Sequence, residues 1–193
     1  MRTILLTLTV AVLGMACQQD DDPQAIPQSS ITHVLLEQAS PFHYLKDFQI
    51  DFDQDSEPDF VFSVGLEYSG GAEHTKFLAK SIRDSKILLL ESSAVAYLSN
   101  KEIGANVTLS NVVWNINSGE LLVKTRHESS ETNWSGSWQA NTEGYLGVSF
   151  KINGEYHYGW IKLLADIEHE EILVQEYAYN TVPGASIMTG QRK

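Results

Sequence analysis

Hydrophobic and polar residues alternate in several short stretches of the chain. The clearest are 48–52, 60–66 and 146–152, in which every second residue is apolar. Successive side chains of a β-strand point to opposite faces, so each stretch is predicted to be a strand with one buried face. Less regular apolar patterns predict further strands at 86–90, 95–98, 121–126, 156–164 and 172–179.

Turn residues follow two of these stretches. Asn153-Gly154 lies between the apolar runs 146–152 and 156–164, and both residues tolerate a positive φ. Asn-Gly between two such runs is a strong signal for a β-hairpin with a two-residue turn. Gly70-Gly71 ends the row that begins at residue 60. We therefore expect a hairpin over 146–164.

Helical patterns are scarce in this sequence. Only 31–37 and 81–92 could be helical, and neither holds a long 3.6-residue period. Many short strands with regular turn signals are typical of an antiparallel β-sandwich or jelly roll. The sequence contains no internal repeat and no sign of a second domain. We predict an all-β chain with one antiparallel, sandwich-like or jelly-roll-like domain at 31–193.

The first residues have the pattern of an export signal. Arg2 precedes an apolar stretch at 4–13, and the small residues Gly14 and Ala16 lead into Cys17. The stretch is too short to span a bilayer and fits a secretory signal peptide. An apolar segment that ends at an isolated cysteine resembles the lipobox of bacterial lipoproteins. That resemblance implies that 1–16 are removed and that Cys17 carries the lipid.

The residues after Cys17 are polar and are predicted to form a flexible tether. Residues 17–30 include two prolines, and their side chains offer almost nothing to bury. The acidic run at 20–22 resembles the lipoprotein export signal of Bacteroidetes, which directs lipoproteins to the outer face of the outer membrane. The resemblance implies a chain that is held at the cell surface by its lipid. Because the sequence ends at 191–193 without a sorting helix, we expect the lipid to be the anchor.

Charge and cysteine content exclude several classes of function. The formal net charge is −12, with 13 basic and 25 acidic residues. Nucleic-acid binding depends on lysine and arginine, so this balance argues against a nucleic-acid partner. Cys17 is the only cysteine. Once it carries lipid, no thiol remains for catalysis, for a disulfide or for a cysteine zinc site.

An acidic loop is the clearest candidate for metal binding. The carboxylates in this loop are Asp51, Asp53, Asp55, Glu57 and Asp59. Clustered oxygen ligands of this type suit Ca²⁺, which takes six to eight of them. The spacing resembles the calcium loops of integrin-type and VCBS-type β repeats, with a serine at position 6 where those loops have glycine. The alternative is a solvated acidic turn between two strands, because Asp, Ser and Pro are ordinary turn residues.

A second resemblance lies near the end of the chain. Tyr158-Gly159-Trp160 is followed by an apolar residue and a lysine, and 177–184 reads YAYNTVPG. These motifs are similar to those of exported bacterial β proteins, many of which carry PEP-CTERM sorting tails. The Asp-rich strand pair is similar as well, whereas about 70–140 are not covered. The resemblance implies an exported β fold and no established enzymatic activity.

The sequence offers no recognisable catalytic set. Its histidines form no His-Glu-x-x-His motif, and it has no Gly-x-Ser-x-Gly elbow or phosphate loop. Trp134 and Trp138 lie in a small polar loop and could stack on sugar rings. The alternative is that both pin this loop to the domain, because tryptophan is highly buried on average.

These features favour a non-enzymatic lipoprotein at the cell surface. We expect a binding or structural role at the envelope, with calcium stabilising the domain. A glycan or an envelope protein is the expected partner, besides the membrane itself. The alternative is a secreted carbohydrate-active hydrolase or carbohydrate-binding module, whose carboxylates the sequence does not single out.

Overall fold

The computed structural model describes residues 30–128, 132–139 and 143–193. The predicted signal peptide at 1–16, Cys17 and nearly all of the tether at 17–30 lie outside these ranges. All regular elements in the described ranges are β-strands, so the predicted all-β class is confirmed. A helix with the length and hydropathy of a membrane span does not occur in the described part of the chain.

Fourteen strands are described. They are β1 (Ile31–Phe42), β2 (Phe48–Ile50), β3 (Phe60–Ser69), β4 (Ala72–Ser81), β5 (Lys86–Leu90), β6 (Ser93–Ala94), β7 (Glu102–Ile103), β8 (Val112–Asn115), β9 (Ser118–His127), β10 (Asn133–Ser135), β11 (Glu143–Ile152), β12 (Glu155–Asp166), β13 (Glu171–Asn180) and β14 (Ile187–Met188).

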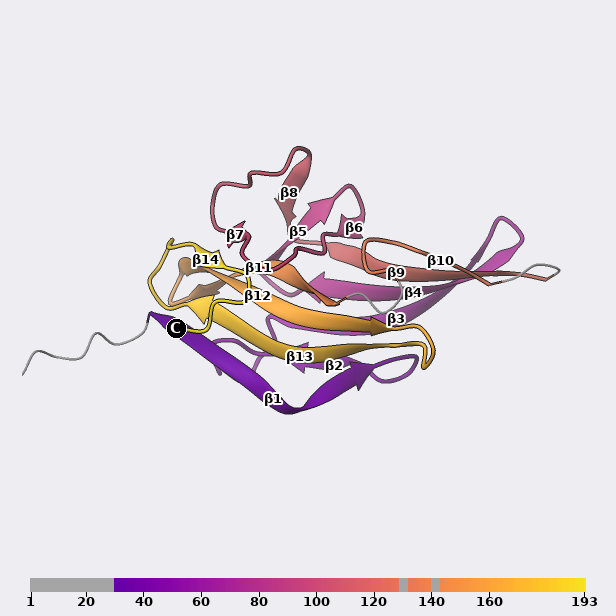
Figure 1. Cartoon of the computed structure of the whole chain (residues 1–193), viewed down its shortest axis with the longest axis horizontal. Coiled ribbons are helices and arrows are strands. Elements are labelled where there is room, and N and C mark those ends of the chain that lie inside the picture. The colour runs from indigo at the N-terminus through magenta and orange to yellow at the C-terminus, as the bar shows by residue number, and fades with distance from the viewer. Residues whose placement is uncertain (1–29, 129–131, 140–142) are drawn as a thin grey trace, which may run out of the picture.

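One twelve-stranded sheet contains most of these strands. Its order is β1-β13-β12-β11-β5-β6-β9-β4-β3-β2, with β10 beside β9 and β8 beside β5. The pairs are antiparallel except β6 and β9, which meet in parallel at Ser93 and Glu120. The sheet curls over on itself, so β1 at one end of the order contacts β2 and β3 at the other (Figure 1). β14 and β7 form a separate two-stranded sheet.

The curled sheet encloses the larger of two apolar clusters. Phe42, Phe62 and Phe77 meet there, with ring centroids 5.4 and 6.3 Å from Phe42. The smaller cluster, centred on Trp160, lies on the other face of β12, because Trp160 and Ile161 point in opposite directions. β12 is therefore buried on both faces, which explains its nearly continuous apolar sequence.

The local strand signals agree well with the structure. β11 and β12 form the predicted hairpin, with φ of 52° at Asn153 and 86° at Gly154. Gly70 and Gly71 make the turn between β3 and β4. Strands also form at the other predicted positions except 95–98, although the one predicted at 48–52 ends at Ile50.

One strand prediction was wrong, and both stretches left open as possible helices contain strands instead. Residues 95–98 do not form a strand; Tyr97 makes only an isolated bridge to Tyr145. The possible helix at 31–37 is part of β1, which pairs with β13. The possible helix at 81–92 contains β5, which pairs with β8, β6 and β11. Pairing with distant strands satisfies the backbone groups that a local helix would otherwise satisfy.

Candidate metal site

The acidic loop joins β2 to β3 and is fixed to the core by one aromatic side chain. Phe52 is 3% exposed and stacks on Phe150, with ring centroids 4.4 Å apart. It also meets Phe60 edge-on at 5.7 Å. Asp51 and Asp53 flank this anchor, so the buried ring holds their backbone against the end of the domain.

Three of the five predicted carboxylates converge. Asp51, Asp53 and Asp59 each present an oxygen within 4.8 Å of the other two, and all three residues are half-buried. Three carboxylates at this distance repel one another unless a proton or a cation lies among them. The arrangement can therefore hold a metal ion.

Hydrogen bonds orient these side chains. Asp59 Oδ2 accepts a bond from the backbone N–H of Phe52 at 2.8 Å, and Asp59 Oδ1 accepts one from Ser85 Oγ at 3.2 Å. Asp51 Oδ2 accepts a bond from the backbone N–H of Ser56 at 2.8 Å. Asp51 Oδ1 is buried and has no hydrogen-bond partner among the described residues. Such an oxygen is costly to leave unpaired, and a cation would satisfy it.

The electrostatics of the cluster favour a bound positive charge. Burial raises the pKa of Asp59 above its ordinary value, against the hydrogen bonds from Phe52 and Ser85. The charges of Asp53 and Asp51 raise the pKa of Asp59 further. Burial also raises the pKa of Asp53, with contributions from Asp55 and Asp51. Each shift means that the ionised form is disfavoured where it stands, which a cation would reverse.

The other two predicted ligands lie elsewhere. Asp55 and Glu57 are exposed and both pair with Arg83, Asp55 at 3.3 Å. The pKa of Asp55 is lowered, chiefly by the backbone N–H of Glu57 and then by Arg83. Their carboxylates hold the tip of the loop to the β4–β5 turn, which contains Arg83.

The loop has the backbone strain that its sequence predicts. Ser56 occupies the position where similar calcium loops have glycine, and its φ is 73°. Gln54 also has a positive φ, of 60°. The loop therefore adopts the backbone of a glycine-containing turn without a glycine.

Residues of the β4–β5 turn also lie at the site and were not predicted from the sequence. A cavity of about 110 Å³ adjoins the triad. Lys151 forms an ion pair with Asp84 at 2.7 Å on its rim. No local sequence signal links these residues to the acidic loop, because they come together only through strand pairing. The cavity is lined by Asp53, Asp59, Arg83, Asp84, Ser85 and Lys151.

The two predicted ligand-binding tryptophans do not form an open platform. Trp138 is 0% exposed, and its Nε1 donates a hydrogen bond to the backbone oxygen of Ala94 at 3.2 Å. Trp134 is half-buried and packs against Phe77, with ring centroids 6.2 Å apart. Trp138 thus has no exposed face on which a sugar ring could stack.

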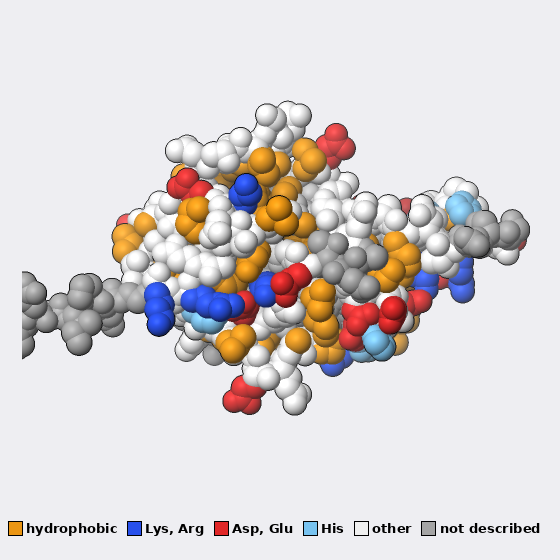
Figure 2. All heavy atoms as spheres, viewed as in Figure 1, with side chains coloured by type: hydrophobic (Ala, Val, Ile, Leu, Met, Phe, Trp, Pro, Cys, Tyr) orange, Lys and Arg blue, Asp and Glu red, His pale blue; other side chains and the backbone are white. Residues whose placement is uncertain are grey.

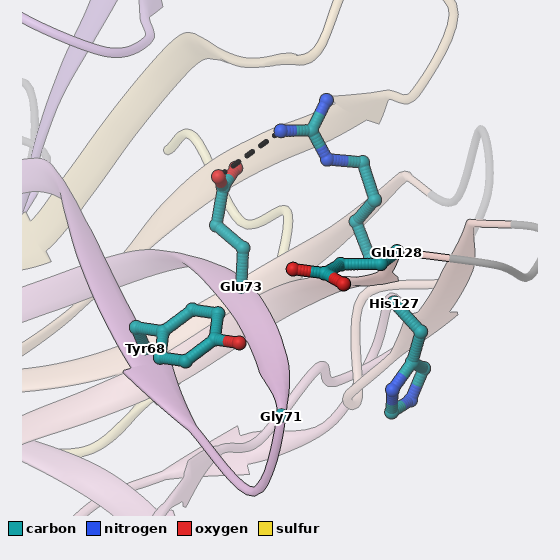
Figure 3. A pocket seen from close by; sticks show the side chains of 6 residues that line it. Tyr68, Gly71, Glu73, His127 and Glu128 are labelled. Atoms are coloured by element: carbon teal, nitrogen blue, oxygen red, sulfur yellow. Dashed lines mark hydrogen bonds and ion pairs between the residues drawn. The ribbon is translucent and has the colours of Figure 1, made fainter.

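A polar hollow lies at the far end of β3 from the acidic loop. Its volume is about 390 Å³, and an ion pair of 3.1 Å between Glu73 and Arg126 crosses one side (Figure 3). The Glu128 carboxylate points into the same space as the Tyr68 ring, whereas His127 points away. Arg126 pairs with Glu73, so among the described residues this hollow presents no pair of free facing carboxylates.

Comparison of the chain with protein-family models, with curated proteins and with solved structures found no match.

Proposed function

We propose that this protein is a lipid-anchored, non-enzymatic protein of the outer cell surface whose β domain binds Ca²⁺ for stability. Its role would be to bind an envelope component or to serve as a structural part of the envelope. The observation that carries the metal part is the convergence of Asp51, Asp53 and Asp59 at a loop that closes the apolar core. The lipid anchor and the cell-surface location are proposed from the sequence at 1–22.

Calcium fits the donor set better than the other common ions. The three side chains supply only hard oxygen atoms, and zinc would favour histidine or cysteine. Ca²⁺ also accepts an irregular ligand geometry that water and backbone carbonyls can complete, whereas Mg²⁺ demands a near-ideal octahedron. A bound ion would join the start of the loop to its end and so clamp β2 to β3.

The binding or structural role rests on the sequence, which contains no known catalytic motif. The alternative of a carbohydrate-active protein depended partly on a tryptophan pair. Because Trp138 is buried, that feature gives the alternative no support.

Thermal unfolding of the lipid-free protein tests the metal proposal. We expect added Ca²⁺ to raise the Tm above its value in EGTA, because an ion that binds only the folded state stabilises it by mass action. Asp53→Asn and Asp59→Asn should each greatly reduce this shift. Asp47→Asn, at an exposed position outside the triad, is the matched control and should keep it. A Tm that is the same in Ca²⁺ and in EGTA would refute the calcium site.

A further inference from the structure

The segment 187–192 runs across the outside of the domain and is held at several points. At its start, β14 pairs with β7, with Ile187 opposite Ile103 and Met188 opposite Glu102. Ile187 is buried in the smaller apolar cluster beside Trp160. Figure 1 shows the segment passing from β14 to a position near the start of β1. We call 187–192 the strap.

Thr189 ties the strap to the turn before β7. Its Oγ1 donates a hydrogen bond to the Leu98 oxygen at 2.7 Å and accepts one from the Lys101 N–H at 2.9 Å. Its backbone N–H bonds to the Lys101 oxygen at 2.8 Å, and its oxygen accepts from the Asn100 N–H at 3.0 Å. Thr189 is 1% exposed. A single buried residue therefore satisfies backbone groups on both sides of this turn.

Arg192 ties the other end of the strap to a buried charge. Its Nε and one terminal nitrogen contact the two oxygens of Glu176 at 3.0 and 2.7 Å. Glu176 lies in β13 and is 2% exposed. His33 Nε2 is 2.7 Å from the same carboxylate, and Lys162 Nζ is 3.8 Å away. A bidentate arginine on a buried carboxylate is among the stronger polar contacts of a protein, since its removal leaves the charge less compensated.

The turn that Thr189 holds lines an apolar groove. The groove has a volume of about 250 Å³, with Leu98 and Leu109 exposed at its rim. Figure 2 shows hydrophobic side chains at the surface in the region of β7 and β8. The groove wall from 95 to 102 contains no strand until β7, so the backbone there depends on contacts with other segments.

We propose that the strap is a built-in conformational device that couples the Glu176 charge cluster to the wall of the apolar groove. Arg192 keeps the strap in place, and Thr189 transmits that restraint to 98–101. Release of Arg192 from Glu176 loosens Thr189 and opens the groove wall, while the large sheet stays intact. A cationic group that competes with Arg192 for the Glu176 carboxylate would therefore open the groove.

Native-state hydrogen exchange of the lipid-free protein tests this coupling. Arg192→Ala should raise exchange about tenfold for the amides of Asn100 and Lys101, which bond to Thr189. Tyr145 bonds to Tyr97 in the groove wall, so its amide is left out of the comparison. Exchange in the rest of the β11–β12 hairpin should stay unchanged, because those hydrogen bonds involve neither the strap nor the groove wall. Lys193→Ala removes a neighbouring exposed charge and is the matched control, with no expected change. Exchange at Asn100 and Lys101 equal to that of this control would overturn the proposal.

Two further variants separate coupling from general loss of stability. Arg192→Lys keeps the charge but loses the bidentate contact, so exchange at the groove wall should be intermediate. Thr189→Val removes the hydroxyl with little change of shape and should raise exchange at the same amides. If the strap acts as one unit, Arg192→Ala should add little in the Thr189→Val background. The proposal would be contradicted if the two substitutions raised exchange at these amides by independent, multiplicative factors. An equal rise of exchange in the β11–β12 hairpin would contradict it as well.

Discussion

Ser56 illustrates how the acidic loop accepts local strain to place its carboxylates. A φ of 73° costs a non-glycine residue about 1 kcal/mol relative to glycine. In return the Ser56 N–H points at Asp51 Oδ2 and holds that side chain toward Asp53 and Asp59. The Asx-type bonds of Asp53 and Asp55 stabilise the rest of the loop.

The raised pKa of Asp59 and of Asp53 predicts an unusual pH dependence without metal. A carboxyl group whose pKa is raised on folding binds a proton more tightly in the folded state. Its contribution to stability is therefore present at low pH and is lost as the pH rises from the ordinary value of 3.8 through the raised pKa. In EGTA, Asp59→Asn should gain stability relative to the unchanged protein as the pH rises through this interval.

Thermal melts between pH 4 and 7 measure this difference, with Asp47→Asn as control. Saturating Ca²⁺ should remove the relative gain of the variant, because the ion needs the ionised carboxylate. A stability difference between Asp59→Asn and the unchanged protein that does not vary with pH would contradict the assigned cause.

The residues of the metal site were only partly predictable. The acidic spacing identified all three members of the triad, because they share one short loop. It also included Asp55 and Glu57, whose side chains are drawn to Arg83 from a different turn. Ser85, which orients Asp59, carried no signal, since its place depends on the pairing of distant strands.

At the scale of elements, the β11–β12 hairpin was the most predictable part of the fold. Its alternation and its Asn-Gly turn are both local, and its two strands pair without a gap in register. β1 and β4 gave much weaker signals. Parts of both strands are half-exposed, and β1 has a register shift between Leu35 and Ser40, so no regular period survives in its sequence.

The hairpin turn allows a direct test of backbone strain. Gly154 has a φ of 86°, and a Cβ built there meets no atom within 4 Å. Gly154→Ala should therefore lower the free energy of unfolding by about 1 kcal/mol through conformational strain alone. Urea unfolding measures the loss. Gly65→Ala, at a position without positive φ and with its nearest contact at 3.8 Å, should be better tolerated. Equal stability of Gly154→Ala and the unchanged protein would rule out a left-handed turn there.

At the scale of the whole molecule, the class of the fold was predictable and the strand order was not. β1 pairs with β13, and β2 closes the opposite end of the same sheet. Neither local alternation nor turn signals specify such distant partners. Nor did they show that β12 would be covered on both faces by two separate clusters.

Fractionation of cells that express the full chain tests the proposed anchor. Cys17→Ser should move the protein from the membrane fraction to the soluble one, because the lipid supplies the only expected membrane attachment. Asp20→Ser tests the acidic run separately and should leave the protein in membranes while reducing its exposure to added protease. Retention of Cys17→Ser in the membrane fraction would contradict lipidation at this cysteine.

The pairing of β1 with β13 has a mechanical consequence for the proposed anchoring at Cys17. A pull on the tether enters the domain at Ser30, whose backbone oxygen binds both the N–H and the hydroxyl of Thr181. Directed along β1, this load acts in shear, so the rungs from Ile31 to Phe42 share it instead of parting one at a time. The register shift between Leu35 and Ser40 divides the ladder into a longer part of five residue pairs and a shorter part of three. A cell-surface domain built in this way would withstand drag along its tether far better than a sideways force that peels Ile31 away first.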